Sequence, residues 1–450
     1  MTIIKDFKRE AEIIGDVLSK APDFDREFRV PTEEFKARQK KVYKAISDKG
    51  FQCGILYSNE QYDGDVPYLG GNTNITVEPV LGIVGKKGFF ILTGLEGGYV
   101  VEQLSPRSGS KVYKVEMLQL ADEEYPIDAA RIEDVIEEAV GGRPESIALL
   151  TPRAVFPVGV YEFFRKYLGS EEKIVDAQEI YYKIKYEKSD IEMQLTEKAS
   201  KITDYMVEGM LSILKPGMYE TQVAKWGYAI AFELGVEELG LDVIVNTNTS
   251  NRSLIGKALN KKINEGDFVH VGVVARCDGL NACERVSVVC TKDPKNINKE
   301  QRYWIDFIEE AYRVAYSSFE KVAKENLAAR IVEETIVNFF KSRSEEVSKK
   351  IGKQIDLSRQ KPYTTFHNAG YTEYAEFFGA ITLNSNEPLG HQIINMCDMA
   401  VRGVGSYWND VIIPGLDYIV IEKTLGKYGS DVRVLNDLPI SVQKYVGKNF

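Results

Sequence analysis

The residues best suited to chemistry lie in the segment 264–290, NEGDFVHVGVVARCDGLNACERVSVVC. Two apolar, β-branched runs separated by a turn predict a hairpin of buried strands. His270 and Gly272 share one face of the first strand, because side chains alternate with period two. The second strand carries the pair Glu284-Arg285. A histidine transfers protons near neutral pH and a carboxylate binds planar cations, so the hairpin is a candidate site; a buried hairpin with one hydrogen-bonded histidine and an ion pair is the alternative.

Composition limits the classes of protein to which the chain can belong. Its 450 residues predict two domains, and 44% hydrophobic with 28% charged residues is ordinary for a globular protein. A net charge of −10 without a long basic run argues against nucleic acid and anionic membranes as partners. No apolar run reaches the length of about 18 residues that a membrane span needs.

Two further features predict a cytoplasmic protein. The first residues, MTIIKDFKREAE, are charged and poor in apolar side chains, unlike a secretory signal. The five cysteines are irregularly spaced and form no CxxC pair, which favours reduced thiols over a disulfide framework.

The elements that position these residues divide the chain into two parts. After a polar lead-in, residues 1–183 alternate strands and helices, which predicts an α/β domain with a mixed sheet. Residues 184–450 open with the clearest helix, begun by a capping box of Ser189 and Glu192, and continue as helices around strand-rich segments, which predicts an α+β domain. The sequence contains neither a GxGxxG nor a GxxxxGK[ST] loop, so nucleotide binding has no support.

Motifs spread along the chain together resemble one family. The motifs of the second half are IKYEKSDI (184–191), LKPGMYE (214–220), NEGD (264–267) and FHNAG (366–370). In this order they resemble segments of the pita-bread family of methionine aminopeptidase, aminopeptidase P, prolidase and creatinase. Arg38 with residues 50–57 and 68–70 resembles the N-terminal domain of creatinase and prolidase. The resemblance implies a creatinase/prolidase-like α/β domain over 1–183 and a catalytic-like α+β pita-bread domain over 184–450.

The resemblance also bears on a metal centre. Peptidases of the family hold two metal ions through two Asp, one His and two Glu side chains, which clamp the attacking and leaving oxygens. The corresponding positions here are Gly272, then Ala282 or Cys283, His367, then Cys397 or Asp398, and Leu416 with Asp417 beside it. Glycine and leucine offer no side-chain ligand, so the sequence predicts a site without a metal ion or other cofactor.

Creatinase, the family member that works without metal, gives a closer pattern. Residues 279–285, GLNACER, resemble its site strand GYYTALER and imply that Glu284 orients the substrate. Its catalytic histidine falls on Asn251 and its carboxylate-binding arginine near Glu78, so creatine itself fits poorly. The resulting prediction is a metal-independent, creatinase-like hydrolase of a non-peptide C–N bond in a small guanidino, ureido or amide substrate, with His367 for proton transfer.

Further side chains complete the predicted site. The family aims the side chain of His367 into the pocket, and His270 faces the same side as Gly272, so both are candidate catalytic residues with Glu284. Glu376 is a fourth candidate catalytic residue. The candidate substrate-binding residues are Glu78, Asn251, Arg285, Glu373, Tyr374, Cys397 and Arg402.

Several alternatives stay open. Cys283 and Cys397 could join His367 in a Cys₂His zinc site with an open position, or be small buried hydrophobic residues. The pocket could catalyse a lyase reaction. The chain could also be a non-catalytic binding protein of this fold, although it lacks the charged extensions of such relatives. By analogy with creatinase, we expect a homodimer in which residues 74–79 cover the partner subunit's site.

Overall fold

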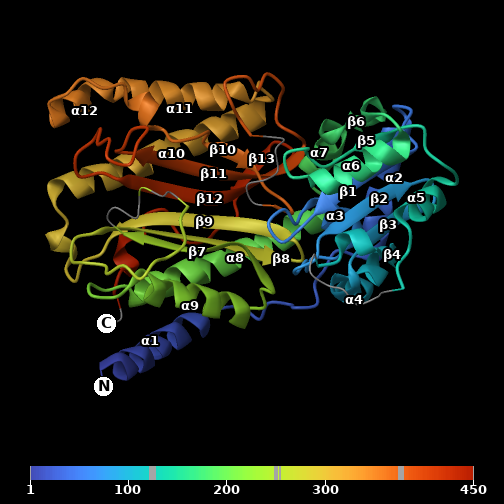
Figure 1. Ribbon diagram of the computed structural model, residues 1–450. Helices are drawn as coiled ribbons and strands as arrows, with labels where there is room; N and C mark the ends of the chain where they lie inside the picture. Colours follow the sequence, from blue (N-terminus) through green and yellow to red (C-terminus); the bar gives the residue numbers. More distant parts are fainter. Residues whose placement is uncertain (1, 121–127, 248–251, 253–254, 373–379, 449–450) are drawn as a thin grey trace. The chain divides into compact units, whose positions relative to one another are not determined.

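The computed structural model describes residues 2–120, 128–247, 252, 255–372 and 380–448 (Figure 1). The chain divides into two compact units. The N-terminal unit is formed by Arg29–Glu187 together with Gly370–Phe378, and the C-terminal unit by all remaining residues, including Met1–Phe28. The predicted division after residue 183 therefore differs in three respects: the first residues join the C-terminal unit, the chain crosses between units after Glu187, and Gly370–Phe378 belongs to the N-terminal unit.

The N-terminal unit contains a mixed sheet of six strands in the order β4-β3-β2-β1-β5-β6. β1 pairs antiparallel with β2 and parallel with β5, which confirms the predicted α/β class. The strands are β1 (Cys53–Ser58), β2 (Val80–Gly85), β3 (Gly88–Thr93), β4 (Lys111–Lys114), β5 (Ile147–Leu149) and β6 (Ile174–Asp176). The helices are α2 (Thr32–Ser47), α3 (Asp65–Gly70), α4 (Leu95–Leu104), α5 (Ile132–Val140), α6 (Val158–Leu168) and α7 (Gln178–Tyr186).

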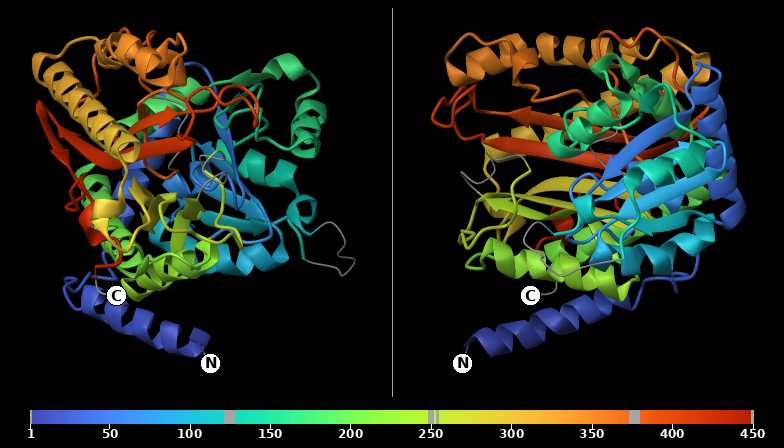
Figure 2. Two further views of the ribbon diagram at one scale, coloured as in Figure 1. Left: turned by 90° about the vertical axis from the view of Figure 1, so that its left-hand side faces the viewer. Right: turned by 45° about the vertical axis from the view of Figure 1, so that its right-hand side comes forward.

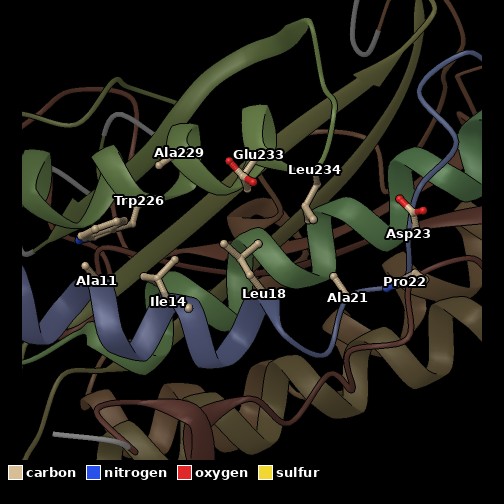
Figure 3. A pocket seen from close by; sticks show the side chains of 11 residues that line it. Ala11, Ile14, Leu18, Ala21, Pro22, Asp23, Trp226, Ala229, Glu233 and Leu234 are labelled. Atoms are coloured by element: carbon tan, nitrogen blue, oxygen red, sulfur yellow. The ribbon is translucent and has the colours of Figure 1, made fainter.

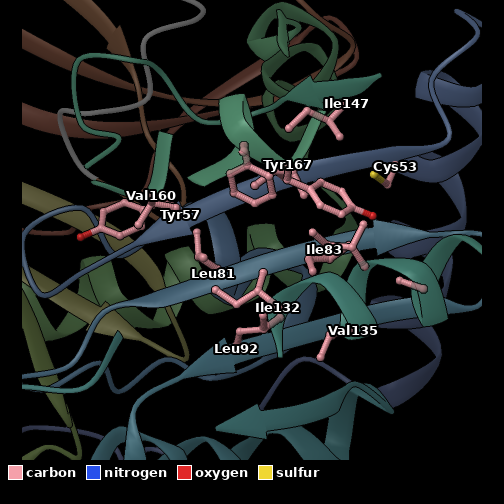
Figure 4. Packing of buried hydrophobic residues seen from close by; sticks show 14 of the residues in the cluster. Cys53, Tyr57, Leu81, Ile83, Leu92, Ile132, Val135, Ile147, Val160 and Tyr167 are labelled. Carbon is pink, nitrogen blue, oxygen red and sulfur yellow. The ribbon is translucent and has the colours of Figure 1, made fainter. Parts of the chain in front are cut away.

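One apolar core stabilises the N-terminal unit (Figure 4). Side chains of the sheet, such as Ile83 and Leu92, pack against α5 and α6, which contribute Val135 and Val160. Burial of such surface stabilises a fold by roughly 25 cal/mol per Å². Every other residue of a strand points to this side, so alternate positions of β2 and β3, such as Ile83 and Leu92, supply apolar side chains to this core.

The C-terminal unit contains a sheet in the order β10-β11-β12-β9-β8-β7, with β13 paired to β12. Its strands are β7 (Glu238–Thr247), β8 (Phe268–Cys277), β9 (Leu280–Val289), β10 (Phe366–Asn368), β11 (Gln392–Arg402), β12 (Tyr418–Tyr428) and β13 (Asp431–Val434). Its helices are α1 (Thr2–Leu18), α8 (Asp190–Ile213), α9 (Glu220–Glu233), α10 (Lys299–Glu325), α11 (Arg330–Ser342) and α12 (Ser344–Ile351). α8 packs on β8 and β9, and α10 packs on β11 and β12. This is the predicted α+β organisation.

Two helices show how local sequence sets this arrangement. The predicted capping box at Ser189 and Glu192 is present at the start of α8 and satisfies amide groups that a helix start leaves unpaired. The sequence predicted a polar lead-in at the start of the chain, and this prediction is wrong. The first residues form the amphipathic helix α1, which packs against α8 and α9 (Figure 2). There the ring of Phe7 stacks on Trp226 with centroids 5.4 Å apart, and Trp226 Nε1 donates to Glu10 Oε2 at 2.7 Å.

The predicted hairpin is β8 and β9, joined at Asp278 and Gly279, whose φ angles of 45° and 90° give the tight turn. Its register pairs Gly272 with Arg285. Neighbouring side chains along a strand point to opposite faces, so Arg285 and Glu284 lie on different sides of the sheet. Among the described residues, no helix has the length and apolar character required to cross a membrane.

Candidate active site

The register of four strands places one row of residues across the C-terminal sheet. Gly272 of β8 is paired with Arg285 of β9, Arg285 with Glu422 of β12, and Glu422 with Asp398 of β11. His367 of β10 is paired with Met396, two residues before Asp398, and so points to the same side. The helices cover the opposite face, since Phe366 stacks on Phe319 of α10 with centroids 4.8 Å apart.

Charged side chains of this row form a buried group that we call the arginine cluster: Arg285, Asp398, Glu422 and His367. Arg285 Nη1 lies 3.1 Å from Asp398 Oδ2 and 3.1 Å from Glu422 Oε2. His367 Nε2 lies 3.3 Å from Glu422 Oε1. The side chain of Glu422 is 0% exposed and that of His367 is 21% exposed, so the histidine connects the cluster with solvent.

The guanidinium of Arg285 is held from every side. Its Nη1 donates to Asp398, its Nη2 to the hydroxyls of Tyr363 and Tyr418, and its Nε to His270 Nε2 at 3.3 Å. The planar fork of arginine suits several acceptors at once, in contrast to the single ammonium of lysine. The position of this cation is therefore fixed by side chains from β8, β11, β12 and the segment before β10.

Gly272 is required by the arginine beside it. A Cβ at Gly272 would lie 2.7 Å from Cγ of Arg285 and 3.4 Å from Cβ of Ile244. Any larger residue at this position therefore collides with the stem of Arg285. The arginine on the next strand therefore requires the glycine at the predicted ligand position.

The electrostatics of the cluster follow from burial and from this cation. Burial raises the pKa of Asp398 to about 7, against the opposing effect of Arg285. Burial also acts to raise the pKa of Glu422, but the charges of Arg285 and His367 outweigh it and hold that pKa below its usual value. Burial, followed by the charge of Arg285, lowers the pKa of His270 well below its usual range, so His270 is a neutral imidazole that accepts a hydrogen bond.

Several predicted residues lie away from the arginine cluster. The carboxylate of Glu284 faces α8 in what we call the lysine cluster: Glu284, Lys423 and Asp204. Lys423 Nζ contacts Glu284 and donates to the carbonyl of Leu438 at 2.7 Å. Burial raises the pKa of Glu284 to about 8. The predicted role of Glu284 in orienting a substrate is therefore wrong for this face, because strand alternation turns its side chain away from His367.

Cys397 and Glu78 are also placed elsewhere. Cys397 is the strand partner of Phe366 and shares its face, opposite to that of Cys283, so the predicted Cys₂His zinc site does not form. Burial raises the pKa of the Cys397 thiol well above its usual value. Glu78 belongs to the N-terminal unit, is 1% exposed, and accepts hydrogen bonds from the amides of Gly97 at 2.7 Å and Leu120 at 3.2 Å. Its carboxylate is occupied by its own unit's backbone.

The remaining predicted residues divide into three groups. His270, Arg285 and His367 are brought together as described. Arg402 ends β11 on the same face as Asp398, two strand alternations away, so its role stays a prediction. The candidates that lie outside the described residues are Asn251, Glu373, Tyr374 and Glu376.

Two members of the arginine cluster, Glu422 and Asp398, and two tyrosines that contact Arg285 were missed or misassigned in the sequence analysis. The second Glu position was assigned to Leu416 with Asp417, but Leu416 precedes β12, and Glu422 stands in the strand itself. The signal was available, because an acidic residue interrupts the apolar run YIVIEKTLG. The first Glu position was assigned to Cys397 or, with a shift of one residue, to Asp398. The pairing of Asp398 with Glu422 decides in favour of Asp398. Tyr363 and Tyr418 had no distinguishing pattern.

The two metal ions implied by the family do not fit these residues. Donor atoms of His367, Asp398 and Glu422 lie within 4.8 Å of one another, which is a spacing suited to one cation. The guanidinium of Arg285 already lies between the two carboxylates. Gly272 supplies no ligand on the other side of the row. The positive charge that balances the two carboxylates is therefore that of the Arg285 side chain and not that of a metal ion.

A separate pocket of about 500 Å³ lies between α1 and α9 in the same unit (Figure 3). Its walls are mainly apolar, with Ile14 and Leu18 of α1 facing Ala229 and Leu234. None of the residues of the arginine cluster lines it. The pocket results from the packing of two amphipathic helices and offers no convergent polar groups of the kind that mark an active site.

Comparison with known proteins identifies the fold. Residues 194–388 match the model of metallopeptidase family M24. An uncharacterized peptidase of Bacillus subtilis, YqhT, is 23% identical over 246 residues, which are 54% of this chain and 66% of that protein. The chain thus spans just under two thirds of the length of this relative.

Solved structures agree over most of the chain. The prolidase of Pyrococcus horikoshii OT3 has a TM-score of 0.66 at 15% identity, covering 90% of this chain and 99% of that one. The Xaa-Pro dipeptidase of Bacillus anthracis has a TM-score of 0.64 at 16% identity, covering 90% and 98%. The X-Pro aminopeptidase of Thermotoga maritima MSB8 has a TM-score of 0.65 at 15% identity, covering 88% and 99%.

These matches correct the predicted reaction. The prediction of a creatinase-like enzyme for a non-peptide C–N bond is wrong, because the matched family and the similar proteins are peptidases. The turned-away side chain of Glu284 removes the residue on which that prediction depended. The resemblance to the pita-bread family is confirmed: residues 194–388 match the model of metallopeptidase family M24, and the chain has the pita-bread fold.

Proposed function

We propose that the protein hydrolyses the peptide bonds of short peptides and that the arginine cluster is its active site. The observation that carries the proposal is the convergence of His367, Glu422, Asp398 and Arg285 on one face of a sheet whose fold is shared with prolidase and Xaa-Pro dipeptidase. A short peptide, rather than a protein, is the substrate named for those similar proteins. Fold alone does not establish an activity, so the assignment rests on the chemistry of these side chains.

His367 is the residue that transfers protons. Its ring is the exposed part of the cluster, and Glu422 holds Nε2 from behind at 3.3 Å. A buried carboxylate behind an imidazole orients the ring and stabilises its protonated form. His367 would take a proton from the attacking water as the C–O bond forms, and return it to the amine nitrogen as the C–N bond breaks.

Three further features of the proposal follow from the same residues and from the family resemblance. The reaction needs no resident metal ion, because Arg285 supplies the positive charge between the carboxylates. The five cysteines are all free and buried, which supports a reducing compartment such as the cytoplasm. A homodimer in which residues 74–79 cover the partner subunit's site rests on the resemblance alone, and light scattering of the purified protein tests it.

The experiment is hydrolysis of a panel of Xaa-Pro dipeptides and other short peptides by protein treated with a chelator, with and without added Mn²⁺ or Co²⁺. We expect cleavage by the chelated wild type, loss of cleavage in His367→Ala and full cleavage in the control His391→Ala, since His391 is an exposed loop residue. Absence of cleavage for every peptide would refute the activity. Cleavage that requires added metal would refute the metal-free reaction alone.

A further inference from the structure

The arginine cluster resembles a cation site in which a side chain takes the place of the ion. Two carboxylates and an imidazole converge within 4.8 Å, and such sets of oxygen and nitrogen donors bind divalent metals. The centre of charge between the carboxylates is the guanidinium of Arg285, 3.1 Å from each. Replacement of one cation by another leaves the charge balance of the buried site intact.

Glu422 gives independent support. It is fully buried, yet within the described chain neither of its carboxylate oxygens accepts a well-directed hydrogen bond. Its strongest contacts are ionic, to Arg285 and to His367, and the thiol of Cys283 adds a weak hydrogen bond. A buried carboxylate usually satisfies its oxygens with several donors, whereas one that faces a cation is satisfied by charge alone. Glu422 is thus balanced mainly by cationic partners, and its carboxylate is one of the three groups whose donor atoms could hold an ion.

Gly272 shows that the arginine is built into the site. Its missing side chain leaves the volume through which the stem of Arg285 passes, with Cγ of Arg285 only 2.7 Å from where a Cβ would stand. Tyr363 and Tyr418 then direct the guanidinium. Removal of the Arg285 side chain would therefore leave a polar void, bounded by Gly272 and both carboxylates, with room for an ion and water.

We propose that Arg285 fills a cation site formed by His367, Asp398 and Glu422, so that the wild type binds no divalent ion there and an Arg285→Ala variant binds one. This inference goes beyond the proposed function because metal content is measured without a substrate. A protein that cleaves no peptide can still show the switch in metal binding, and failure of the switch leaves cleavage untouched.

The test measures Co²⁺ and Zn²⁺ bound after equilibrium dialysis, by elemental analysis, in the wild type, Arg285→Ala and the double variant Arg285→Ala/Glu422→Gln. We expect no bound ion in the wild type, about one equivalent in Arg285→Ala, and at least tenfold weaker binding in the double variant, which lacks one charged ligand. Tight binding by the wild type that Asp398→Asn abolishes would overturn the proposal. Equal metal content in Arg285→Ala and the double variant would also overturn it.

The Arg285→Ala variant leaves two buried carboxylates without their partner, so its folding is tested as well. If the variant does not fold in the presence of chelator, refolding from urea is repeated with Co²⁺. The proposal predicts recovery of folded protein with Co²⁺ for Arg285→Ala and none for the double variant. Failure of Co²⁺ to restore the fold of Arg285→Ala would count against the proposal.

Discussion

The arginine cluster and the lysine cluster lie back to back on the same sheet, and their members are neighbours in sequence. Arg285 follows Glu284 in β9, and Lys423 follows Glu422 in β12. Because side chains alternate along a strand, the two members of each sequence pair point to opposite faces of the sheet. Both clusters are buried groups of acidic and basic side chains. They differ in access, since His367 of the arginine cluster reaches solvent at 21% exposure, whereas both side chains of the Lys423–Glu284 pair are at most 1% exposed. Buried acidic and basic side chains alone therefore do not indicate an active site. Such side chains in contact with a solvent-accessible histidine, as at His367, do indicate one.

The largest contrast between the clusters concerns turnover. We expect His367→Ala and Glu422→Gln to lower kcat/KM for a cleaved dipeptide by a factor of roughly 10²–10⁴, as loss of a positioned proton carrier does. Lys423→Met, in the lysine cluster, should leave kcat of the folded protein unchanged. Steady-state kinetics on variants with matched circular dichroism checks this. An equal loss in Lys423→Met would show that access does not distinguish the clusters.

Stability should respond strongly in the arginine cluster. Removal of the guanidinium in Arg285→Ala leaves Asp398 and Glu422 buried together, which costs about 3–5 kcal/mol in metal-free buffer. Arg285→Lys should recover only part of this, because an ammonium cannot reach all the acceptors of the fork. Urea denaturation measures the free energy of unfolding. A loss below about 1 kcal/mol for Arg285→Ala would mean that the cation is not required to hold the carboxylates.

A smaller effect tests the dependence of Arg285 on Gly272. Gly272→Ala forces a Cβ against the stem of Arg285 and should cost about 1–3 kcal/mol. In an Arg285→Ala background the same substitution should cost little, since its nearest neighbour is gone. The double-mutant cycle gives the coupling free energy directly. Additive losses of stability for Gly272→Ala and Arg285→Ala would show that Gly272 does not depend on Arg285.

The last contrast is a pH dependence in the lysine cluster. The pKa of Glu284 is raised to about 8 by burial and by Asp204, against the opposing charge of Lys423. Between about pH 4.5 and pH 8 the unfolded chain has lost this proton while the folded chain keeps it, so the wild type loses stability as pH rises through this window. Glu284→Gln has no such proton. The melting temperature of the wild type should fall relative to that of Glu284→Gln from pH 5 to pH 8, and a constant difference would contradict this.

Much of the fold could be predicted from local signals. The hairpin of β8 and β9 follows from its apolar runs and turn, and the start of α8 from its capping box. The first residues could not be assigned, because the charged residues of α1 mask an apolar face whose partner, Trp226, lies more than 200 residues away. Long-range packing of this kind leaves no local pattern.

The site was harder to predict than the fold, for a physical reason. His367, Arg285 and His270 were candidates, but the strand pairing that puts Glu422 and Asp398 beside Arg285 joins segments more than 100 residues apart. Glu284 was favoured because residues 279–285, which include it, resembled a known motif. Which of two adjacent residues faces the site depends on the register of the whole sheet, and a shift of one residue reverses the answer.

The most direct test of the account is peptide cleavage by wild-type protein whose metal content has been measured after exhaustive chelation. We predict that protein with no bound divalent ion cleaves a short peptide and that His367→Ala, equally free of metal, does not. Cleavage that appears only when a divalent ion is restored, in proportion to the ion bound, would contradict the assignment of the site's positive charge to Arg285.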